Sequence, residues 1–412
     1  MWAAFLAAFI LLAIVRLLMS GSSQSAFSSS GSSSSQPSTG GGGGGAPAVD
    51  ESLLWATPYV VSTDPDAPFQ TIQAALVQVA ADNPAFAGIL VETGLWVEDL
   101  DFSVLTGIGT ALVAIKPIAG RITIQGVTGI NPGVNLDLRF ENCVFRTGFG
   151  LASVQVSTNC AVEMRDCETE DGMTVLQDPL EQQPIEVTLR RCSHDGPFSA
   201  AALVVDGGLI RAYECSFSTN ALAFGAVRLI ETGTAETDFF GEGCFFSAAD
   251  PGSPDFTGVI QAEGANVTLV GQATGQSSNC EAQNRPAISA TSGQIVVQDG
   301  VILRALGQAI IYVTDGANVE VQRSTLESFS NTNAIFASTV PAVMTVVDSE
   351  VVAGTDPPVT PADLTFSSDV AGCTLVYSTL YGVPITYPVT PGPFAAIAFA
   401  SATDIEQIPL GV

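Results

Sequence analysis

Lysine is almost missing from this chain: Lys116 is the only one among 412 residues, against twelve arginines. Charged residues make up only 13% of the sequence, and the formal net charge is −28. Nucleic acids and anionic lipids are bound through basic patches. The composition therefore argues against either as the main partner, and we expect no nucleic-acid binding.

Helical and metal-binding signals are also scarce. Amphipathic runs with a period of 3.6 residues are absent after residue 85, which excludes a helical solenoid. Histidine occurs once, at His194, and no CxxC pair or His/Cys cluster is present. Zinc is therefore not expected, and the sequence predicts no cofactor.

A repeat built on cysteine is what the sequence does contain. Five cysteines recur every 23 to 29 residues in similar short frames such as VEMRDCET and VTLRRCSH: Cys143, Cys167, Cys192, Cys215 and Cys244. The same frame continues with small residues or cysteine at Gly300, Ser324, Ser349 and Cys373. The step from Cys244 to Gly300 corresponds to two coils of 28 residues. Such a period is typical of a solenoid, in which each repeat packs only on its neighbours.

The residues around each cysteine indicate strands. Apolar residues stand five and three positions before it and two positions after it, as in one face of a strand. The position directly before it is polar or glycine, which predicts a bend: Asn142, Asp166, Arg191, Glu214, Gly243, Asp299, Arg323 and Asp348. Strand, bend and strand within one repeat predict an all-β parallel β-helix with the cysteines facing the core. About twelve coils would form a rod roughly 55–60 Å long.

The chain resembles the pectin-lyase-like right-handed parallel β-helix superfamily over roughly residues 56–385. Many members open with a TIQxA helix and then a G-x-Y/W-x-E turn. These motifs are matched by Thr71, Ile72, Gln73 and Ala75, and by Gly94, Trp96 and Glu98. Residues 68–82 have an amphipathic pattern that predicts a capping helix, and the resemblance implies that a right-handed β-helix follows it. It does not imply one activity, because this fold carries lyases, hydrolases, esterases, adhesins and inert shafts.

The two ends of the chain differ from the repeat. Residues 2–19 are apolar except for Arg16, and a Ser/Gly-rich stretch follows. We predict five segments: a membrane anchor or signal peptide (1–19), a linker (20–50), an N-terminal cap (51–88), the β-helix (89–385) and a C-terminal cap or tail (386–412). An uncleaved single-pass anchor is the preferred interpretation, and Arg16 places the rod on the cytoplasmic side. The tail can cap its own last coil or pack on a neighbour, so a homo-oligomer such as a trimer is a further hypothesis.

The redox state expected of the cysteines indicates the cellular compartment of the rod. Neighbours stacked in one inward column would have parallel Cβ directions, which disulfide geometry disfavours. We therefore predict a buried column of reduced thiols. Asn266-Val267-Thr268 is a glycosylation sequon, and Asn266 is a site only if the rod is lumenal or extracellular.

Outward columns beside the cysteines supply the candidate binding residues. Arg139 should face Glu163, and Glu141 should face Arg165, on adjacent coils. One interpretation is a sugar-binding face, with arginines for uronate carboxylates and Tyr213 for stacking. The other is a surface ion-pair lattice that sets the register, each pair contributing about 1 kcal/mol or less.

Catalytic candidates are weaker. Acidic residues gather after Cys167, in what the pattern indicates is a loop: Glu168, Glu170, Asp171, Asp178 and Glu181. Gln177-Asp178 is similar to a pectin methylesterase motif, but residues 196–200 lack the family's second aspartate and its Arg-Pro-Trp segment is missing. The resemblance therefore implies a lost active site. For an enzyme, Asp171, Asp178 and Arg190 are the candidates; His194 is expected to be a packed core residue.

The leading hypothesis is a membrane-anchored rod with a structural or surface-binding role, such as a virion membrane or capsid-associated protein of a large DNA virus, or a cell-surface protein. Its partners would be the membrane and a capsid or surface protein or polysaccharide. The alternatives are a polysaccharide-active hydrolase, lyase or esterase, and a secreted carbohydrate-binding adhesin.

Overall fold

The computed structural model divides the chain into two units, Met1–Val49 and Asp50–Val412. The structure describes residues 51–328, except 133–135, 149–150, 158–159, 179–183, 198–199, 234, 252–256, 272–277, 307–309 and 314–316. Beyond residue 328 it describes the backbone of seven strands. The predicted anchor, the linker up to residue 50 and most of the C-terminal tail lie outside the described residues.

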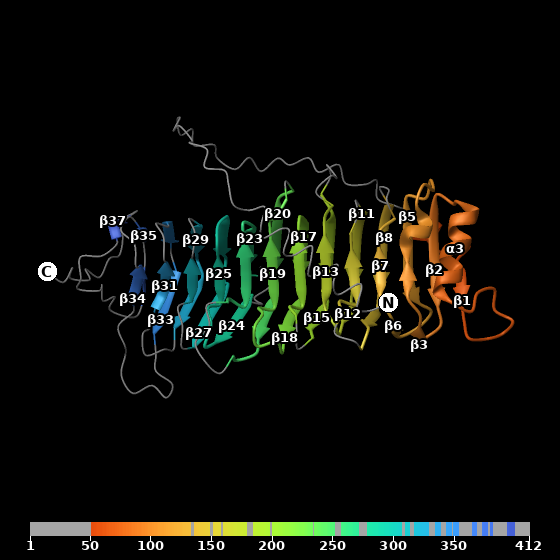
Figure 1. Ribbon diagram of the computed structural model, residues 1–412, viewed down its shortest axis with the longest axis horizontal. Coiled ribbons are helices and arrows are strands. Elements are labelled where there is room, and N and C mark those ends of the chain that lie inside the picture. The colour runs from red at the N-terminus through yellow and green to blue at the C-terminus, as the bar shows by residue number, and fades with distance from the viewer. Residues whose placement is uncertain are drawn as a thin grey trace, which may run out of the picture. The chain divides into compact units, whose positions relative to one another are not determined.

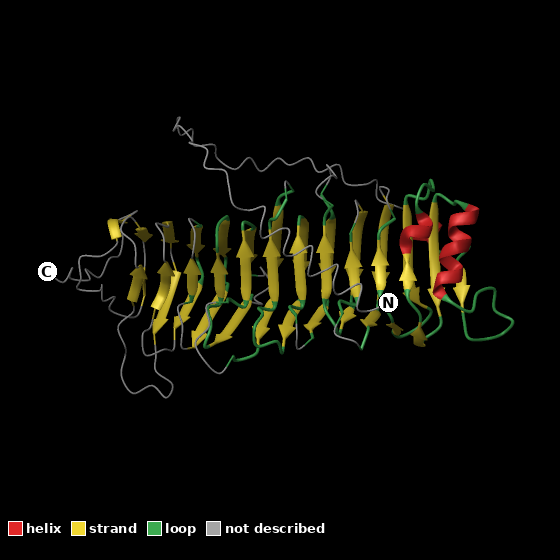
Figure 2. Cartoon of the chain, in the orientation of Figure 1, coloured by secondary structure: helices red, strands yellow, loops and turns green. Residues whose placement is uncertain are grey.

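The described chain from residue 59 onward is a parallel β-solenoid with very little helix, as predicted (Figures 1 and 2). Its strands stack into three parallel sheets of 14, 11 and 12 described strands, so the count of coils differs from the single value of about twelve that the sequence predicts.

Each coil contributes one strand to each sheet, apart from the two ends. Sheet A contains β1 (Tyr59–Val61), β2 (Phe86–Val91), β5 (Leu112–Pro117), β8 (Leu136–Glu141), β11 (Cys160–Arg165), β14 (Glu186–Arg190), β17 (Gly208–Tyr213), β20 (Thr237–Glu242), β23 (Asn266–Val270), β26 (Gln294–Gln298), β29 (Asn318–Gln322), β32 (Val343–Val347), β35 (Cys373–Tyr377) and β37 (Phe394–Phe399). Sheet B contains β3 (Gly94–Val97), β6 (Ile122–Gln125), β9 (Cys143–Arg146), β12 (Glu168–Thr169), β15 (Ser193–Gly196), β18 (Ser216–Thr219), β21 (Phe245–Ala248), β24 (Asn279–Gln283), β27 (Ile302–Leu306), β30 (Thr325–Ser328), β33 (Ser349–Ala353) and β36 (Leu380–Tyr381). Sheet C contains β4 (Leu100–Asp101), β7 (Thr128–Ile130), β10 (Val154–Val156), β13 (Met173–Leu176), β16 (Leu203–Asp206), β19 (Val227–Ile230), β22 (Ile260–Glu263), β25 (Ile288–Ala290), β28 (Ile311–Val313), β31 (Ala334–Ser338) and β34 (Thr365–Ser368).

In seven coils a residue in the left-handed backbone conformation joins sheets A and B, directly before the cysteine or the residue that takes its place in the repeat. The backbone φ there is positive, from 44° to 62°: Asn142, Asp166, Arg191, Glu214, Gly243, Asp299 and Arg323. Non-glycine residues rarely adopt this conformation. The predicted bend is confirmed for these coils, whereas Asp348 lies outside the described residues. In the coils of the five cysteines and of Ser324, the bend turns the next residue into the core.

The five cysteines occupy one interior column, as predicted, and each is at most 3% exposed. Each thiol donates to the carbonyl two residues earlier, across the bend; Cys167 Sγ lies 3.2 Å from Arg165 O and Cys192 Sγ 3.3 Å from Arg190 O. Ser324 makes the same bond to Gln322 O, at 2.8 Å. In the coils of the five cysteines and of Ser324, the column therefore holds a small side chain that donates a hydrogen bond. Burial raises the pKa of Cys167 and Cys215, which keeps these two thiols protonated.

The register after Cys244 differs from the prediction of two 28-residue coils. Ser278 continues the column: it directly precedes Asn279, which pairs with Phe245, and its Oγ accepts from Cys244 N at 3.0 Å. In the next coil the bend contains both Asp299 and Gly300, each with positive φ, so Val301 rather than Gly300 enters the core. The first of these two coils is longer than predicted, 34 residues from Cys244 to Ser278, and the second is shorter, 23 residues from Ser278 to Val301, so their sum concealed both differences.

Helices occur only at the N-terminal end of the described chain: α2 (Glu51–Leu54), α3 (Ile72–Asp82) and the short 3-10 helix η1 (Phe102–Leu105). The predicted capping helix is therefore present but begins at Ile72 rather than near residue 68. Thr71 caps it, with its side chain accepting from Ala74 N at 3.0 Å. Glu98 completes the cap: its two carboxylate oxygens accept from Ile72 N at 2.9 Å and from Gln73 N at 3.0 Å.

The two motifs on which the family resemblance rests thus contact each other at the N-terminal end of α3, through Glu98 and the backbone of Ile72 and Gln73. Gln73 exchanges two hydrogen bonds with the backbone of Asp101, and Trp96 Nε1 donates to Glu92 O at 2.9 Å. Gly94 has φ of 152°. These residues tie the helix to the first coil, so their presence explains the fold and says nothing about chemistry.

Replacing Glu98 with alanine should loosen α3. Two N–H groups at the start of the helix would lose their acceptor, which typically costs about 1 kcal/mol. We expect hydrogen exchange of the amides in 72–82 to accelerate roughly 5-fold, a factor equivalent to that energy. Glu231→Ala removes an exposed carboxylate elsewhere and should leave these rates unchanged; equal rates in both variants would show that Glu98 does not hold the cap.

Candidate functional site

The outer face of sheet A brings the candidate binding residues together. In register, Arg139, Glu163, Thr188 and Arg211 form one column, and Glu141, Arg165, Arg190 and Tyr213 form the next. This follows from the period of the repeat, because equivalent positions of successive coils stack directly.

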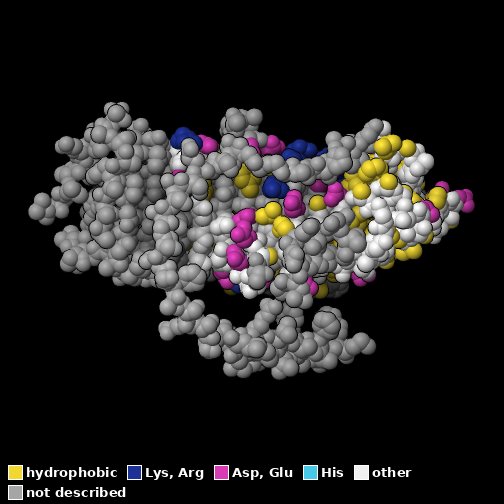
Figure 3. All heavy atoms as spheres, turned by 90° about the horizontal axis from the view of Figure 1, so that it is seen from above, with side chains coloured by type: hydrophobic (Ala, Val, Ile, Leu, Met, Phe, Trp, Pro, Cys, Tyr) yellow, Lys and Arg dark blue, Asp and Glu magenta, His cyan; other side chains and the backbone are white. Residues whose placement is uncertain are grey.

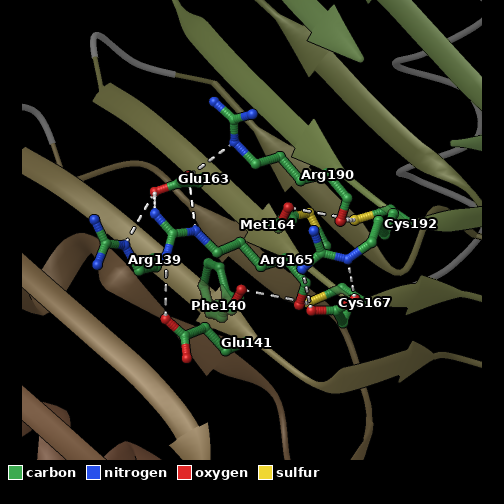
Figure 4. A network of polar contacts seen from close by, with 11 residues as sticks. Arg139, Phe140, Glu141, Glu163, Met164, Arg165, Cys167, Arg190 and Cys192 are labelled. Atoms are coloured by element: carbon green, nitrogen blue, oxygen red, sulfur yellow. Dashed lines mark hydrogen bonds and ion pairs between the residues drawn. The ribbon is translucent and has the colours of Figure 1, made fainter. Parts of the chain in front are cut away.

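Glu163 is the centre of the network shown in Figure 4. Its carboxylate lies 3.0 Å from Arg139 Nε, 2.8 Å from Arg165 Nε and 3.4 Å from Arg190 Nε. Arg165 also reaches Glu141, at 3.8 Å. Both ion pairs expected from the sequence are therefore present, and Glu163 joins three arginines from three coils.

The protonation of Glu163 reflects these neighbours. Partial burial acts to raise its pKa, but the hydrogen bond and charge of Arg165, with Arg139 and Arg190, outweigh burial and leave the pKa lowered. The carboxylate therefore stays ionised at neutral pH, which suits an ion-pair lattice and not a proton donor.

Tyr213 extends this face toward the next coil. The Arg190 guanidinium carbon lies 4.6 Å from the Tyr213 ring centroid, and the ring of Phe240 follows at 5.9 Å. Arg190 thus contacts Tyr213 on one side and Glu163 on the other, which leaves it engaged within the chain.

The catalytic candidates are not brought together. Asp171 precedes β13 and Asp178 follows it, so an extended segment of seven residues, roughly 20 Å long, separates them. Arg190 lies on sheet A, outside both loops. Asp171 Oδ2 accepts from Thr147 N at 2.6 Å, from Gly148 N at 2.9 Å and from the Thr147 hydroxyl at 3.1 Å, so it holds the neighbouring loop.

The other residues singled out in the sequence have structural surroundings. Glu168 pairs with Arg121 at 3.1 Å and Glu170 with Arg146 at 4.0 Å, whereas Glu181 lies outside the described residues. His194 is fully buried, 2.9 Å from the Thr169 hydroxyl and stacked on Phe217 at 5.1 Å between centroids. The prediction of a packed, hydrogen-bonded core histidine is confirmed.

The sequon at Asn266 begins strand β23. Its Nδ2 donates to Asp238 at 2.8 Å, and its Oδ1 accepts from Gln294 N at 3.1 Å. The amide therefore bridges two neighbouring coils, and a glycan could be attached only before these contacts form.

Two polar features escaped sequence reasoning. On the outer face of sheet C, Arg228 lies 3.0 Å from Glu263, and Gln261 donates to the same carboxylate at 2.7 Å. Arg285 is fully buried, and its two Nη atoms donate to Phe224 O at 2.8 Å and Leu222 O at 2.7 Å, two coils away. The columns of sheet C could have been found once its register was known; nothing in the sequence marks Arg285.

Among the described residues, no group of three or more His, Cys, Asp or Glu side chains is arranged to hold a metal ion. Over the same part of the chain, no helix has the length and apolar character needed to span a membrane. Comparison with known proteins found no family model, no curated protein and no solved structure that matches this chain.

Proposed function

We propose that this chain is a rod-like β-solenoid protein with a structural or surface-binding role, belonging to the pectin-lyase-like right-handed superfamily and anchored to a membrane through residues 2–19. One observation carries the non-catalytic part: Asp171, the best carboxylate candidate, accepts three hydrogen bonds from the loop that it holds. A general acid must instead be free to reach a substrate.

The ion pairs of sheet A support the same role. Arg139, Arg165 and Arg190 all pair with Glu163, and Arg165 also pairs with Glu141, so a uronate ligand would have to compete with carboxylates of the chain itself. The buried thiols and Arg16 suit a rod that faces the cytoplasm or the interior of a particle, as in a virion membrane protein of a large DNA virus.

The rival function is a polysaccharide-active enzyme. Incubating the full-length protein in nonionic detergent with pectin, alginate and peptidoglycan fragments should release neither reducing ends nor methanol above background. Release that disappears in an Asp171→Asn or Asp178→Asn variant would overturn the proposal in favour of the enzyme. In parallel, the protein should stay with membranes through carbonate extraction; a mature N-terminus between residues 20 and 30 would contradict the anchor.

A further inference from the structure

His194, the one histidine of the chain, lies inside the rod in a column of sheet B. In register this column runs through Phe145, Thr169, His194, Phe217 and Phe246. The imidazole is stacked on Phe217 at 5.1 Å between centroids, and Phe217 on Phe246 at 5.4 Å. The side chain is fully buried, and no histidine is seen on the face of the molecule shown in Figure 3. A titratable ring thus takes the place of an aromatic ring in the core.

Only one nitrogen of this imidazole is hydrogen-bonded among the described residues. Nδ1 lies 2.9 Å from the Thr169 hydroxyl, whereas Nε2 has no partner in the part of the chain that the structure describes. A neutral imidazole satisfies Thr169 through Nδ1 in either tautomer. A protonated imidazole carries N–H groups on both nitrogens, so Nε2 would need an acceptor that these residues do not supply. The site therefore suits the neutral ring.

The described interior around the ring holds thiols and apolar side chains. The Cys192 thiol contacts two backbone carbonyl oxygens, at 3.3 Å each, which accept only from a protonated thiol. Burial raises the pKa of Cys167 and Cys215, in the coils on either side. The side chains that sheets A and C turn into the same coil are apolar: Val187, Leu189, Leu203 and Val205.

The carboxylates nearest in sequence lie on the other side of the backbone, on the outer face of sheet B. Glu168 and Asp195 alternate with buried residues in strands β12 and β15. Glu168 and Glu170 pair with arginines at 3.1 and 4.0 Å, and Asp195 accepts from the Ser218 hydroxyl. Among the described residues, no carboxylate therefore faces the imidazole.

These surroundings make the folded coil sensitive to acid. A histidine exposed to water takes up a proton near about pH 6.5, and burying that charge without a partner is costly. Below this pH the unfolded segment binds one proton more than the folded coil, so stability falls as the pH falls. The loss is confined to a few coils, because each coil of a solenoid contacts only its neighbours.

We propose that His194 is a pH-responsive element that loosens the coil of β14, β15 and β16 when the pH falls below about 6. The rod is closed at neutral pH and opens locally in an acidic compartment. This inference goes beyond the proposed structural role and depends neither on the anchor nor on a ligand.

Nuclear magnetic resonance of the full-length protein in nonionic detergent, expressed without a histidine tag, tests the protonation directly. Because the chain has one histidine, labelling histidine Cε1 with carbon-13 gives a single resonance. We expect the resonance of the folded protein to stay at the position of the neutral ring from about pH 7.5 to about pH 5. A continuous shift of that resonance to the protonated position, centred near about pH 6.5, would overturn the proposal.

Hydrogen exchange of the same protein tests the loosening, with His194→Phe as the reference because it keeps a stacked ring. Between about pH 7.5 and about pH 5, the opening equilibrium of the amides in 186–190 and 203–206 should rise about 30-fold more in the natural protein than in the variant. This is the ratio for one histidine that is protonated only in the open state. His194→Gln, which is neutral at both pH values, replaces the phenylalanine variant if that variant does not fold.

Two controls locate the effect. The amides of β26, four coils away, should respond alike in both proteins. Asp195→Asn changes the adjacent residue and removes only an outward carboxylate, so it should keep the full response. A response that is shared by the His194 variants, lost in Asp195→Asn or equally large at β26 would refute the assignment to His194.

Discussion

Replacing Phe246 with alanine is expected to lower the free energy of unfolding by about 3–5 kcal/mol, the usual range for truncating a buried aromatic residue. Phe246 is fully buried, stacked on Phe217 at 5.4 Å and packed edge-on against Phe239 at 6.0 Å. The cavity would remove aromatic contacts within its own coil and with the coil before it, so neighbouring side chains cannot easily close it.

Phe245 provides a matched control, because it is the adjacent residue in the same strand but 39% exposed. Phe245→Ala should cost less than about 1 kcal/mol. Chemical denaturation of the two variants, followed by circular dichroism, measures both values. Equal losses would mean that β21 does not alternate between core and surface as described.

Cys192→Leu is expected to destabilise the protein by about 1–3 kcal/mol, because the neighbouring coils hold cysteine at this position and leave no room for a larger side chain. The Cys192 thiol lies 3.3 Å from Met164 O in the preceding coil, so a larger side chain would have to displace backbone. Leucine also removes one of the two donors to Arg190 O at the bend, which would keep only the bond from Asp166 N at 2.9 Å.

Cys192→Ser separates volume from hydrogen bonding. Serine is small and can donate to the same carbonyl, as Ser324 does in its own coil, so it should be tolerated far better than leucine. Thermal melting of both variants compares them. A leucine variant with an unchanged midpoint would show that the column tolerates larger side chains than the structure implies.

The repeat made the fold predictable from the sequence. Each coil places the same residue types at equivalent positions, so the cysteine column, the bend before it and the Arg139–Glu163 pair all follow from alignment of the repeats alone. The entry of Val301 into the core did not follow, because an inserted residue in a bend leaves the flanking strand patterns intact.

The candidate site was less predictable. The period of the repeat predicts which residues of successive coils stack, but it does not show where the strands lie between the cysteine positions. Asp171 and Asp178 were therefore grouped as neighbours, although strand β13 separates them. Arg285 illustrates the same limit: its carbonyl partners come from a loop two coils earlier, a contact that depends on loop conformation rather than on the repeat.

The cap built from Thr71 and Glu98 has a consequence for how the rod forms during synthesis. Its contacts join residues fewer than 30 positions apart, so they can close as soon as the first coil has left the ribosome. The strands of each later coil then pair in parallel with the strands of the coil before it, which are already in place. Each new coil needs contacts only with that preceding coil. We therefore expect the chain to fold in the order of its synthesis, with the growing C-terminal edge as the one place where an incomplete rod could pair with another.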